Sequence, residues 1–272
     1  MNMESGKLDD LLLQLRPFVL KTAAFLREEN ARFSRKMVEE KGLNNLVSWV
    51  DKEAEKQLVE ACSSILPEAG FITEEGTVGA SQKEDSLLWI IDPLDGTTNF
   101  VHRLPEYSIS VGLVCKGEPV LGMIAHADRD KLYYARKGGG AWCNGQQLFN
   151  SSESKLSGSL LATGFPYYDF DHMPQYLEVL HHFMKNTHGL RRMGSAAIDL
   201  AYVAEGVFEG FFEYNLNPWD VAAGICLVRE AGGLVTDFRG ENNALFGRQI
   251  IAAGPAVHAA MLEIIRNRWE LR

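Results

Sequence analysis

Two aspartates three residues apart offer the clearest chemistry in the sequence. Asp92 and Asp95 follow an apolar run at residues 87–91, and a short apolar run bounded by turn residues predicts an interior strand. Two buried anions side by side repel each other. A divalent cation resolves that conflict, because carboxylate oxygens are the ligands that Mg²⁺ prefers. The alternative interpretation is an ordinary Asp-Pro-x-Asp-Gly turn in a loop.

The residues that follow these aspartates could hold an anion. Gly96, Thr97 and Thr98 bring backbone N–H groups and hydroxyls to a place where a helix is expected to begin, and such a place suits a phosphate group. Metal ligands next to a phosphate cradle predict phosphoryl chemistry, in which positioning and charge stabilisation contribute most of the catalysis.

Three further acids lie on elements that could bring them to the same place. Glu74 follows a short strand, Asp51 lies on an early helix, and Asp220 lies near the start of a late one. Taken singly, each could be an ordinary charge. Glu74 could be a loop charge beside Glu75, and Asp51 could be a solvated charge on its helix. Asp220 could be an acid at a helix start, where the macrodipole favours it. The set is more informative than its members, because separate elements supply them.

Alternating helices and strands must position these residues. Apolar residues at helical spacing predict helices at residues 9–30, 47–66, 174–186, 195–205, 218–231 and 255–268. Strands are predicted at residues 70–73, 87–91, 107–115, 119–127, 131–137, 160–163, 189–193, 207–213, 234–237 and 249–253, and polar connections at 39–45 and 76–85. The order mixes an antiparallel meander with α/β units, which predicts an α+β fold of stacked sheets and helices.

The chain has room for two packed lobes. Its 272 residues are 46% hydrophobic, which is enough for a sizeable core. A Ser-rich polar stretch at residues 150–158 predicts an N-terminal α+β lobe, residues 1–150, and a C-terminal α/β lobe, residues 151–272. The first lobe carries most of the candidate metal ligands and the second carries Asp220, so we expect one compact catalytic unit.

Composition argues against several classes of partner. The net charge is −9 and no basic run is present, so nucleic-acid binding is not favoured. The four cysteines are scattered without C-x-x-C spacing, as expected in a reducing compartment. No stretch approaches the roughly 20 apolar residues of a membrane span, and residues 1–10 lack a signal-peptide pattern. We therefore expect a cytoplasmic protein without a membrane partner.

Four separated segments make the sequence resemble the inositol monophosphatase family of Mg²⁺-dependent, lithium-sensitive phosphatases. They are residues 46–51 (Leu-Val-Ser-Trp-Val-Asp), the pair Glu74-Glu75, residues 92–102 (Asp-Pro-Leu-Asp-Gly-Thr-Thr-Asn-Phe-Val-His), and residues 219–224 (Trp-Asp-Val-Ala-Ala-Gly) running on to residues 230–233. The resemblance covers nearly the whole chain. It implies a layered α-β-α-β-α sandwich, a homodimer, and two or three Mg²⁺ ions in each site.

The resemblance also implies a set of metal ligands. Glu74, Asp92 and the backbone carbonyl of Leu94 would bind a first Mg²⁺. Asp92, Asp95 and Asp220 would bind a second, and a third, weaker cation would lie near Glu74. Two cations can clamp the attacking and leaving oxygens of an in-line displacement, so no seryl or cysteinyl nucleophile is required.

Catalytic and substrate-binding roles follow from the same resemblance. Thr97, with Asp51 behind it, would orient the attacking water, and these two residues with Glu74 form the implied catalytic set. The N–H groups of Gly96 and Thr97 would hold the phosphate. The implied contacts to the alcohol part of the substrate are Gly194, Ser195, Ala196 and Glu213.

The predicted function is Mg²⁺-dependent hydrolysis of a small polyol phosphate by metal-activated water, with myo-inositol 1-phosphate as the first substrate to test. The same chemistry on fructose 1,6-bisphosphate, histidinol phosphate or a 3′-phosphoadenosine nucleotide stays open. An alternative of another class is a regulatory or binding protein that keeps the phosphatase fold.

Overall fold

The computed structural model describes residues 3–32, 38–40, 46–79 and 87–269. Its helices are α1 (Ser5–Arg32), α2 (Trp49–Ile65), α3 (Thr97–His102), α4 (Met173–Asn186), α5 (Ala196–Glu205), α6 (Pro218–Glu230) and α7 (Pro255–Trp269), with short 3₁₀ helices at Ala127–Arg129 and Leu156–Gly158. None of the helices in the described ranges is long and apolar enough to span a membrane. Residues 41–45 and 80–85 of the two predicted polar connections lie outside the described residues.

The strands of the described residues form three sheets. A two-stranded sheet pairs β1 (Val38–Glu40) with β2 (Leu46–Ser48). A seven-stranded sheet has the order β3 (Gly70–Thr73), β4 (Leu87–Asp95), β5 (Ser108–Cys115), β6 (Glu118–His126), β7 (Lys131–Arg136), β8 (Ala141–Cys143) and β9 (Gln146–Leu148). A five-stranded sheet has the order β11 (Gly189–Arg191), β10 (Leu160–Thr163), β12 (Gly210–Tyr214), β14 (Gln249–Ala253) and β13 (Leu234–Thr236).

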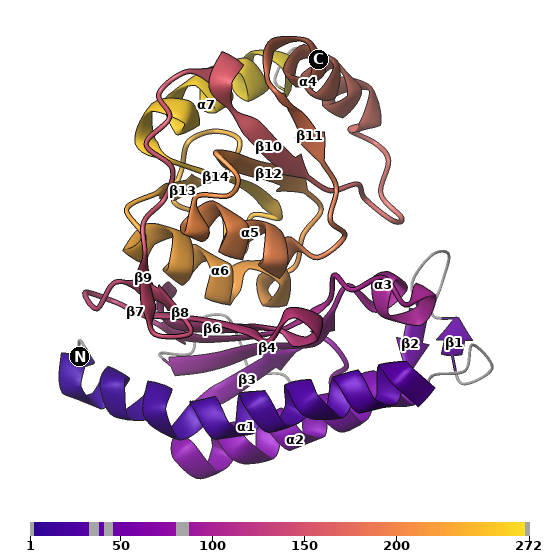
Figure 1. The fold of residues 1–272 in the computed structure, drawn as a ribbon, viewed down its shortest axis with the longest axis vertical. Coiled ribbons are helices and arrows are strands. Elements are labelled where there is room, and N and C mark those ends of the chain that lie inside the picture. Colours follow the sequence, from indigo (N-terminus) through magenta and orange to yellow (C-terminus); the bar gives the residue numbers. More distant parts are fainter. Residues whose placement is uncertain (1–2, 33–37, 41–45, 80–86, 270–272) are drawn as a thin grey trace.

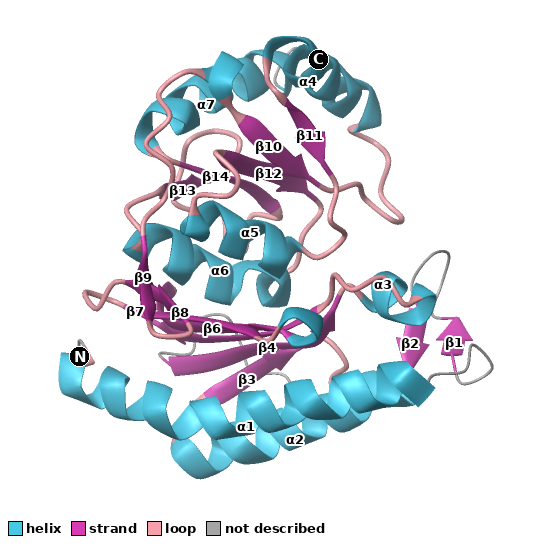
Figure 2. Cartoon of the chain, in the orientation of Figure 1, coloured by secondary structure: helices cyan, strands magenta, loops and turns pink. Residues whose placement is uncertain are grey.

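The helices and sheets stack in alternating layers (Figure 1). α1 and α2 pack on one face of the seven-stranded sheet, and α5 and α6 lie between that sheet and the five-stranded sheet. α4 and α7 cover the remaining face of the five-stranded sheet. Figure 2 shows the same alternation of helix and strand layers. This order confirms the predicted α+β fold and its α-β-α-β-α sandwich.

Strand β4 lies between two hydrophobic cores. Leu88 and Ile90 belong to the core around α5 and α6, whereas Trp89 and Ile91 belong to the core under α1 and α2. A strand that is covered on both faces reads as a continuous apolar run rather than as an alternating one. This explains why residues 87–91 could be predicted as an interior strand.

Several predicted boundaries were wrong by a few residues: α1 begins at Ser5 rather than at residue 9, and β12 begins at Gly210 rather than at residue 207. Two further differences lie close to Asp92 and Asp51. β4 does not end at Ile91 but continues to Asp95, and its pairing with β5 shifts register between Asp92 and Asp95. Pro93 lies in that irregular step, where a residue without an N–H group is tolerated. The helix predicted at 47–66 begins at Trp49, because residues 46–48 pair with β1 instead.

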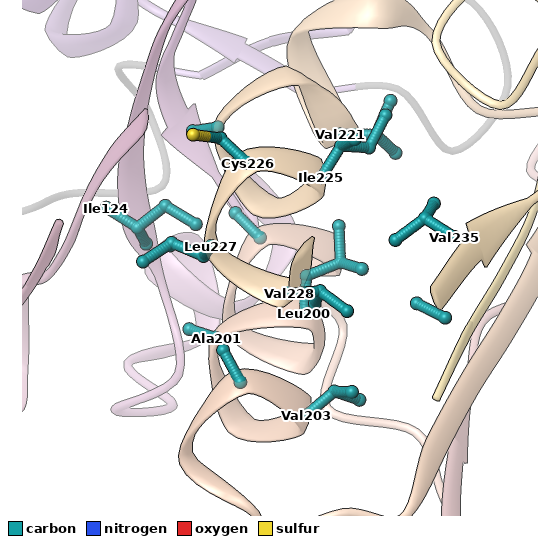
Figure 3. Close-up of a cluster of buried hydrophobic side chains, with 14 of the residues drawn as sticks. Ile124, Leu200, Ala201, Val203, Val221, Ile225, Cys226, Leu227, Val228 and Val235 are labelled. Atoms are coloured by element: carbon teal, nitrogen blue, oxygen red, sulfur yellow. The ribbon is translucent and has the colours of Figure 1, made fainter. Parts of the chain in front are cut away.

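Helix α6 approaches the seven-stranded sheet closely. A Cβ atom on Gly122 of β6 would lie 2.3 Å from the carbonyl oxygen of Ala223, so no larger residue fits without movement. Residues 221–228 are all buried, as expected for a helix covered on both sides. Figure 3 shows Ile124 of β6 on one side of the two middle helices and Val235 of β13 on the other. This packing fixes where the first turn of α6 lies relative to β4.

Candidate active site

The predicted site residues gather around one recess. A cavity of about 140 Å³ opens where β4, α3, α5, α6 and β12 meet. It is lined by every predicted site residue except Asp51, namely Glu74, Asp92, Leu94, Asp95, Gly96, Thr97, Gly194, Ser195, Ala196, Glu213 and Asp220. Asp51 is buried in the first turn of α2, and its charge adds to the effect of burial in raising the pKa of Glu74.

Residues 92–97 form an internally bonded turn at the end of β4. Asp92 Oδ1 accepts a hydrogen bond from the N–H of Leu94 at 3.0 Å, and the Thr97 hydroxyl donates to the carbonyl of Leu94 at 3.0 Å. Gly96 has a φ of +92°, and a Cβ there would lie 3.0 Å from the carbonyl oxygen of Glu106. Glycine at this position therefore satisfies both the left-handed conformation and the lack of space.

Asp95 is held at the start of α5. Its Oδ2 accepts hydrogen bonds from the hydroxyl of Ser195 at 2.6 Å and from the N–H of Ala197 at 2.7 Å. Ser195 is itself the N-cap residue, since its Oγ accepts from the N–H of Ile198 at 3.2 Å. Burial raises the pKa of Asp95 to about 6, and these hydrogen bonds oppose the rise because they favour the carboxylate.

Asp220 comes from the first turn of α6. Its Oδ2 accepts a hydrogen bond from the N–H of Asn217 at 2.6 Å. Burial raises the pKa of Asp220 well above its ordinary value, and the charges of Asp95 and Glu74 contribute to the rise. Burial also raises the pKa values of Asp92 and Glu74, that of Glu74 to about 8. The recess therefore concentrates negative charge that nearby arginines only partly offset.

The donor atoms of this recess suit a divalent cation. Carboxylate and carbonyl oxygens are ligands of Mg²⁺, and mutual repulsion of the acids is what a cation would relieve. Among the described residues, however, no three Asp, Glu, His or Cys side chains lie close enough together to hold a metal ion as they stand. The acids instead accept hydrogen bonds from neighbouring N–H and O–H groups. Their metal-binding roles therefore stay a prediction.

Glu55, which was not predicted as a site residue from the sequence, holds the segment that carries Glu74. Glu55 is 0% exposed on α2. Its carboxylate accepts hydrogen bonds from the hydroxyls of Thr73 (3.0 Å) and Thr77 (2.6 Å) and from the N–H groups of Glu75 (2.7 Å) and Thr77 (2.7 Å). These bonds bracket Glu74 on both sides. The available signal was an acid on the apolar face of an amphipathic helix.

Glu213 lies across the recess, at the end of β12. A Cβ atom on Gly164 would lie 2.0 Å from Glu213 Oε1, so the carboxylate rests directly against the glycine backbone. Burial raises the pKa of Glu213 to about 8. Glu213 was predicted as a site residue from the family resemblance. The contact of its carboxylate with the loop that begins at Gly164 was not predicted.

Aromatic residues form the rim on the same side. The guanidinium of Arg192 lies over the rings of Phe165 and Tyr167, at 6.0 Å and 5.7 Å from their centroids, and donates a hydrogen bond to the Tyr167 hydroxyl at 2.7 Å. All three residues line the cavity. The aromatic residues of this rim could not be predicted from the sequence, because they carry no spacing or charge that separates them from a surface loop.

Comparison with known proteins identifies the family to which this site belongs. A model of the inositol monophosphatase family matches residues 12–270. The chain belongs to the inositol monophosphatase family. This confirms the resemblance found in the four sequence segments, and the layered fold described above is that of the family's solved structures.

Similar members of the inositol monophosphatase family carry two kinds of name. The Nus factor SuhB of Escherichia coli strain K12 is 42% identical over 228 residues, which are 84% of this chain and 85% of that protein. The inositol-1-monophosphatase of Mesorhizobium japonicum is 39% identical over 233 residues, 85% and 87% of the two chains. The crystal structure of the extragenic suppressor protein SuhB from Bartonella henselae superposes with a TM-score of 0.87 at 35% identity, over 94% of this chain and 97% of that one.

Proposed function

We propose that this member of the family is a Mg²⁺-dependent phosphomonoesterase. Its substrate would be a small polyol phosphate, with myo-inositol 1-phosphate as the first choice and water as the nucleophile. The observation that carries the proposal is the convergence of four acids, supplied by the end of β3, by β4 and by α6, on one recess. Backbone N–H groups of the turn after β4 lie beside them.

The acids would hold the metal. The proposed ligands of two or three Mg²⁺ ions are Glu74, Asp92, Asp95, Asp220 and the carbonyl of Leu94. Bound there, Mg²⁺ supplies positive charge that stabilises the charge developing on the transferred phosphoryl group. The raised pKa values of the acids support this proposal, since burial and mutual repulsion leave them in need of a counter-charge.

Other groups would bind and orient the reactants. The N–H groups of Gly96 and Thr97 would donate hydrogen bonds to the phosphate oxygens. The Thr97 hydroxyl, with Asp51 behind it, would orient the attacking water. The proposed contacts to the alcohol part are Gly194, Ser195 and Ala196 at the start of α5, and Glu213 on β12.

The proposal joins both halves of the chain in one catalytic unit. Residues 1–150 supply most of the acids, and residues 151–272 supply Asp220 and Glu213. We further propose that two copies of the chain form a homodimer. Size-exclusion chromatography with light scattering tests this, and a mass of one chain at micromolar concentration would contradict it.

Conservative substitutions test the site itself. Asp95→Asn and Asp220→Asn each remove one negative charge while keeping the size of the side chain, so hydrolysis should fall by about 100-fold or more. Circular dichroism and thermal unfolding should stay close to those of the wild type, because each substitution also removes charge repulsion in the recess. Asp171→Asn, at an exposed position, is the matched control. Unchanged hydrolysis in Asp95→Asn and Asp220→Asn would refute the site.

A substrate panel tests the choice of alcohol. We expect myo-inositol 1-phosphate to give a higher kcat/KM than fructose 1,6-bisphosphate, histidinol phosphate or a 3′-phosphoadenosine nucleotide. A decisive preference for one of the last three would replace the proposed substrate while leaving the proposed chemistry in place.

A binding or regulatory role is the second candidate, and the name Nus factor, carried by a relative that is 42% identical, favours it. Fluorescence anisotropy with labelled RNA at low and at physiological salt tests one form of this role. Salt-sensitive binding would support it, since contacts to phosphates weaken as salt rises. Hydrolysis without measurable RNA affinity would support the enzyme alone.

A further inference from the structure

Asp199 is a buried acid in the wall of the recess, and the proposed function gives it no role. It lies in the first turn of α5 and is 1% exposed. Its side chain lines the cavity, yet its Oδ1 has no hydrogen-bond partner among the described residues. Burial of a carboxylate oxygen without a donor is unfavourable, so an acid at such a position calls for a partner that the described part of the chain does not supply.

The described groups around Asp199 do not supply the missing hydrogen bond to its Oδ1. Burial raises its pKa well above the ordinary value, and the charges of Glu213, Asp95 and Glu106 raise it further, whereas Arg192 opposes the rise. No hydrogen bond or ion pair joins Arg192 to Asp199 among the described residues, because the guanidinium is bound to the Tyr167 hydroxyl and lies over aromatic rings. Arg192 therefore balances charge without acting as the missing donor.

Glu213 provides a second acceptor nearby. This half-buried residue also lines the cavity, and no hydrogen bond from a described residue contributes to the pKa of its carboxylate. The wall thus presents two acceptors, one from α5 and one from β12, to the same space. A ligand group that satisfies both must offer two donors. The neutral hydroxyls of the polyol ester in the proposed function can supply both donors.

We propose that Asp199 is a specificity-determining residue that accepts a hydrogen bond from a second hydroxyl of the alcohol part, beside the hydroxyl that Glu213 accepts. This inference rests on the proposed phosphatase function and narrows it to esters whose alcohol carries at least two free hydroxyls. An ester without free hydroxyls makes no use of Asp199. Loss of the Asp199 carboxylate therefore weakens hydrolysis of a polyol phosphate selectively.

The test compares two substrates that share a ring and differ in hydroxyls. Myo-inositol 1-phosphate carries free hydroxyls, and cyclohexyl phosphate carries none. In Asp199→Ala, kcat/KM for the inositol ester should fall by about 10- to 100-fold, mainly through KM, while that for cyclohexyl phosphate should change by less than about twofold. Asp199→Asn keeps a carbonyl acceptor at the same place and should recover most of the loss.

Thermal unfolding provides a readout that separates this role from a structural one. Because Asp199 is buried with an unsatisfied oxygen, both substitutions should leave the Tm unchanged or raise it. A fall in Tm with equal losses on both substrates would overturn the inference and assign Asp199 to the fold. Equal activity of wild type and Asp199→Ala on the inositol ester would also overturn it. A wild-type enzyme that hydrolyses cyclohexyl phosphate at least as well as every polyol ester would refute the proposed substrate class itself.

Discussion

Replacing Glu55 with alanine tests how the fold holds Glu74 in place. The change removes the acceptor of four hydrogen bonds that come from Thr73, Glu75 and Thr77. Hydrogen bonds to a charged group contribute about 1.5–3 kcal/mol each when fully buried. Residues 73–77 are half-buried or exposed, so water can replace part of what is lost. We therefore expect the free energy of unfolding to fall by about 2–4 kcal/mol, well below the sum of four full bonds.

The same substitution should impair hydrolysis more than its effect on stability explains. Glu74 would lose the bonds that fix the residues on either side of it, and misplacement of a reacting group by about 1 Å can reduce the rate on the order of 100-fold. The assays are thermal unfolding, with an expected decrease in Tm of about 5–15 °C, and kcat measured well below the transition. Thr77→Val removes only one hydroxyl and should show a smaller effect of the same kind.

Glu60→Ala is the matched control for this experiment. Glu60 lies on the same helix but is exposed, so its loss should change neither Tm nor kcat appreciably. If Glu55→Ala has the same Tm and the same kcat as Glu60→Ala, then Glu55 does not hold the segment that carries Glu74, and the reasoning is refuted.

Three other results are expected. Gly122→Ala should reduce the free energy of unfolding by about 1–3 kcal/mol in thermal unfolding, because the new Cβ would meet the backbone of α6. Gly79→Ala is the control and should have no such effect, because a Cβ at Gly79 has nothing within 4 Å. Equal effects of the two substitutions would contradict the close packing. Burial lowers the pKa of His258 in the folded chain. Below about pH 6.5 the unfolded chain therefore binds a proton at His258 more readily than the folded chain does, and the free energy of unfolding falls. Between about pH 7.5 and 5.5, His258→Gln should therefore lose less stability than the wild type, and parallel losses would argue against the shift. Li⁺ added at saturating Mg²⁺ should slow phosphate release, and an unchanged rate would contradict lithium sensitivity.

The sequence predicted the parts of the fold in which local pattern and tertiary environment agree. Residues 87–91 read as an interior strand because β4 is covered on both faces, by α1 and α2 on one side and by α5 and α6 on the other. The apolar periodicity of the helices reflects the same layers. The position of Asp220 near a helix start was visible from Pro218, which suits the first turn.

Other features depend on partners that are distant in sequence. The register shift between Asp92 and Asp95 exists only through pairing with β5, so the strand was predicted to end too early. Glu55 and Asp199 are buried acids on helices, and a single acid in an apolar pattern gives no sign of whether donors will surround it. Donors from residues 73–77 surround Glu55, whereas one oxygen of Asp199 has none among the described residues.

The most direct test of the central claim is phosphate release from myo-inositol 1-phosphate, measured with the purified chain before and after removal of divalent cations. The proposal predicts hydrolysis in the presence of Mg²⁺, its loss on chelation, and its recovery when Mg²⁺ is restored. It also predicts that Asp220→Asn stays inactive at every Mg²⁺ concentration while remaining folded. Hydrolysis that continues at the same rate without divalent cations, or that survives in Asp220→Asn, would contradict a metal-dependent site at this recess.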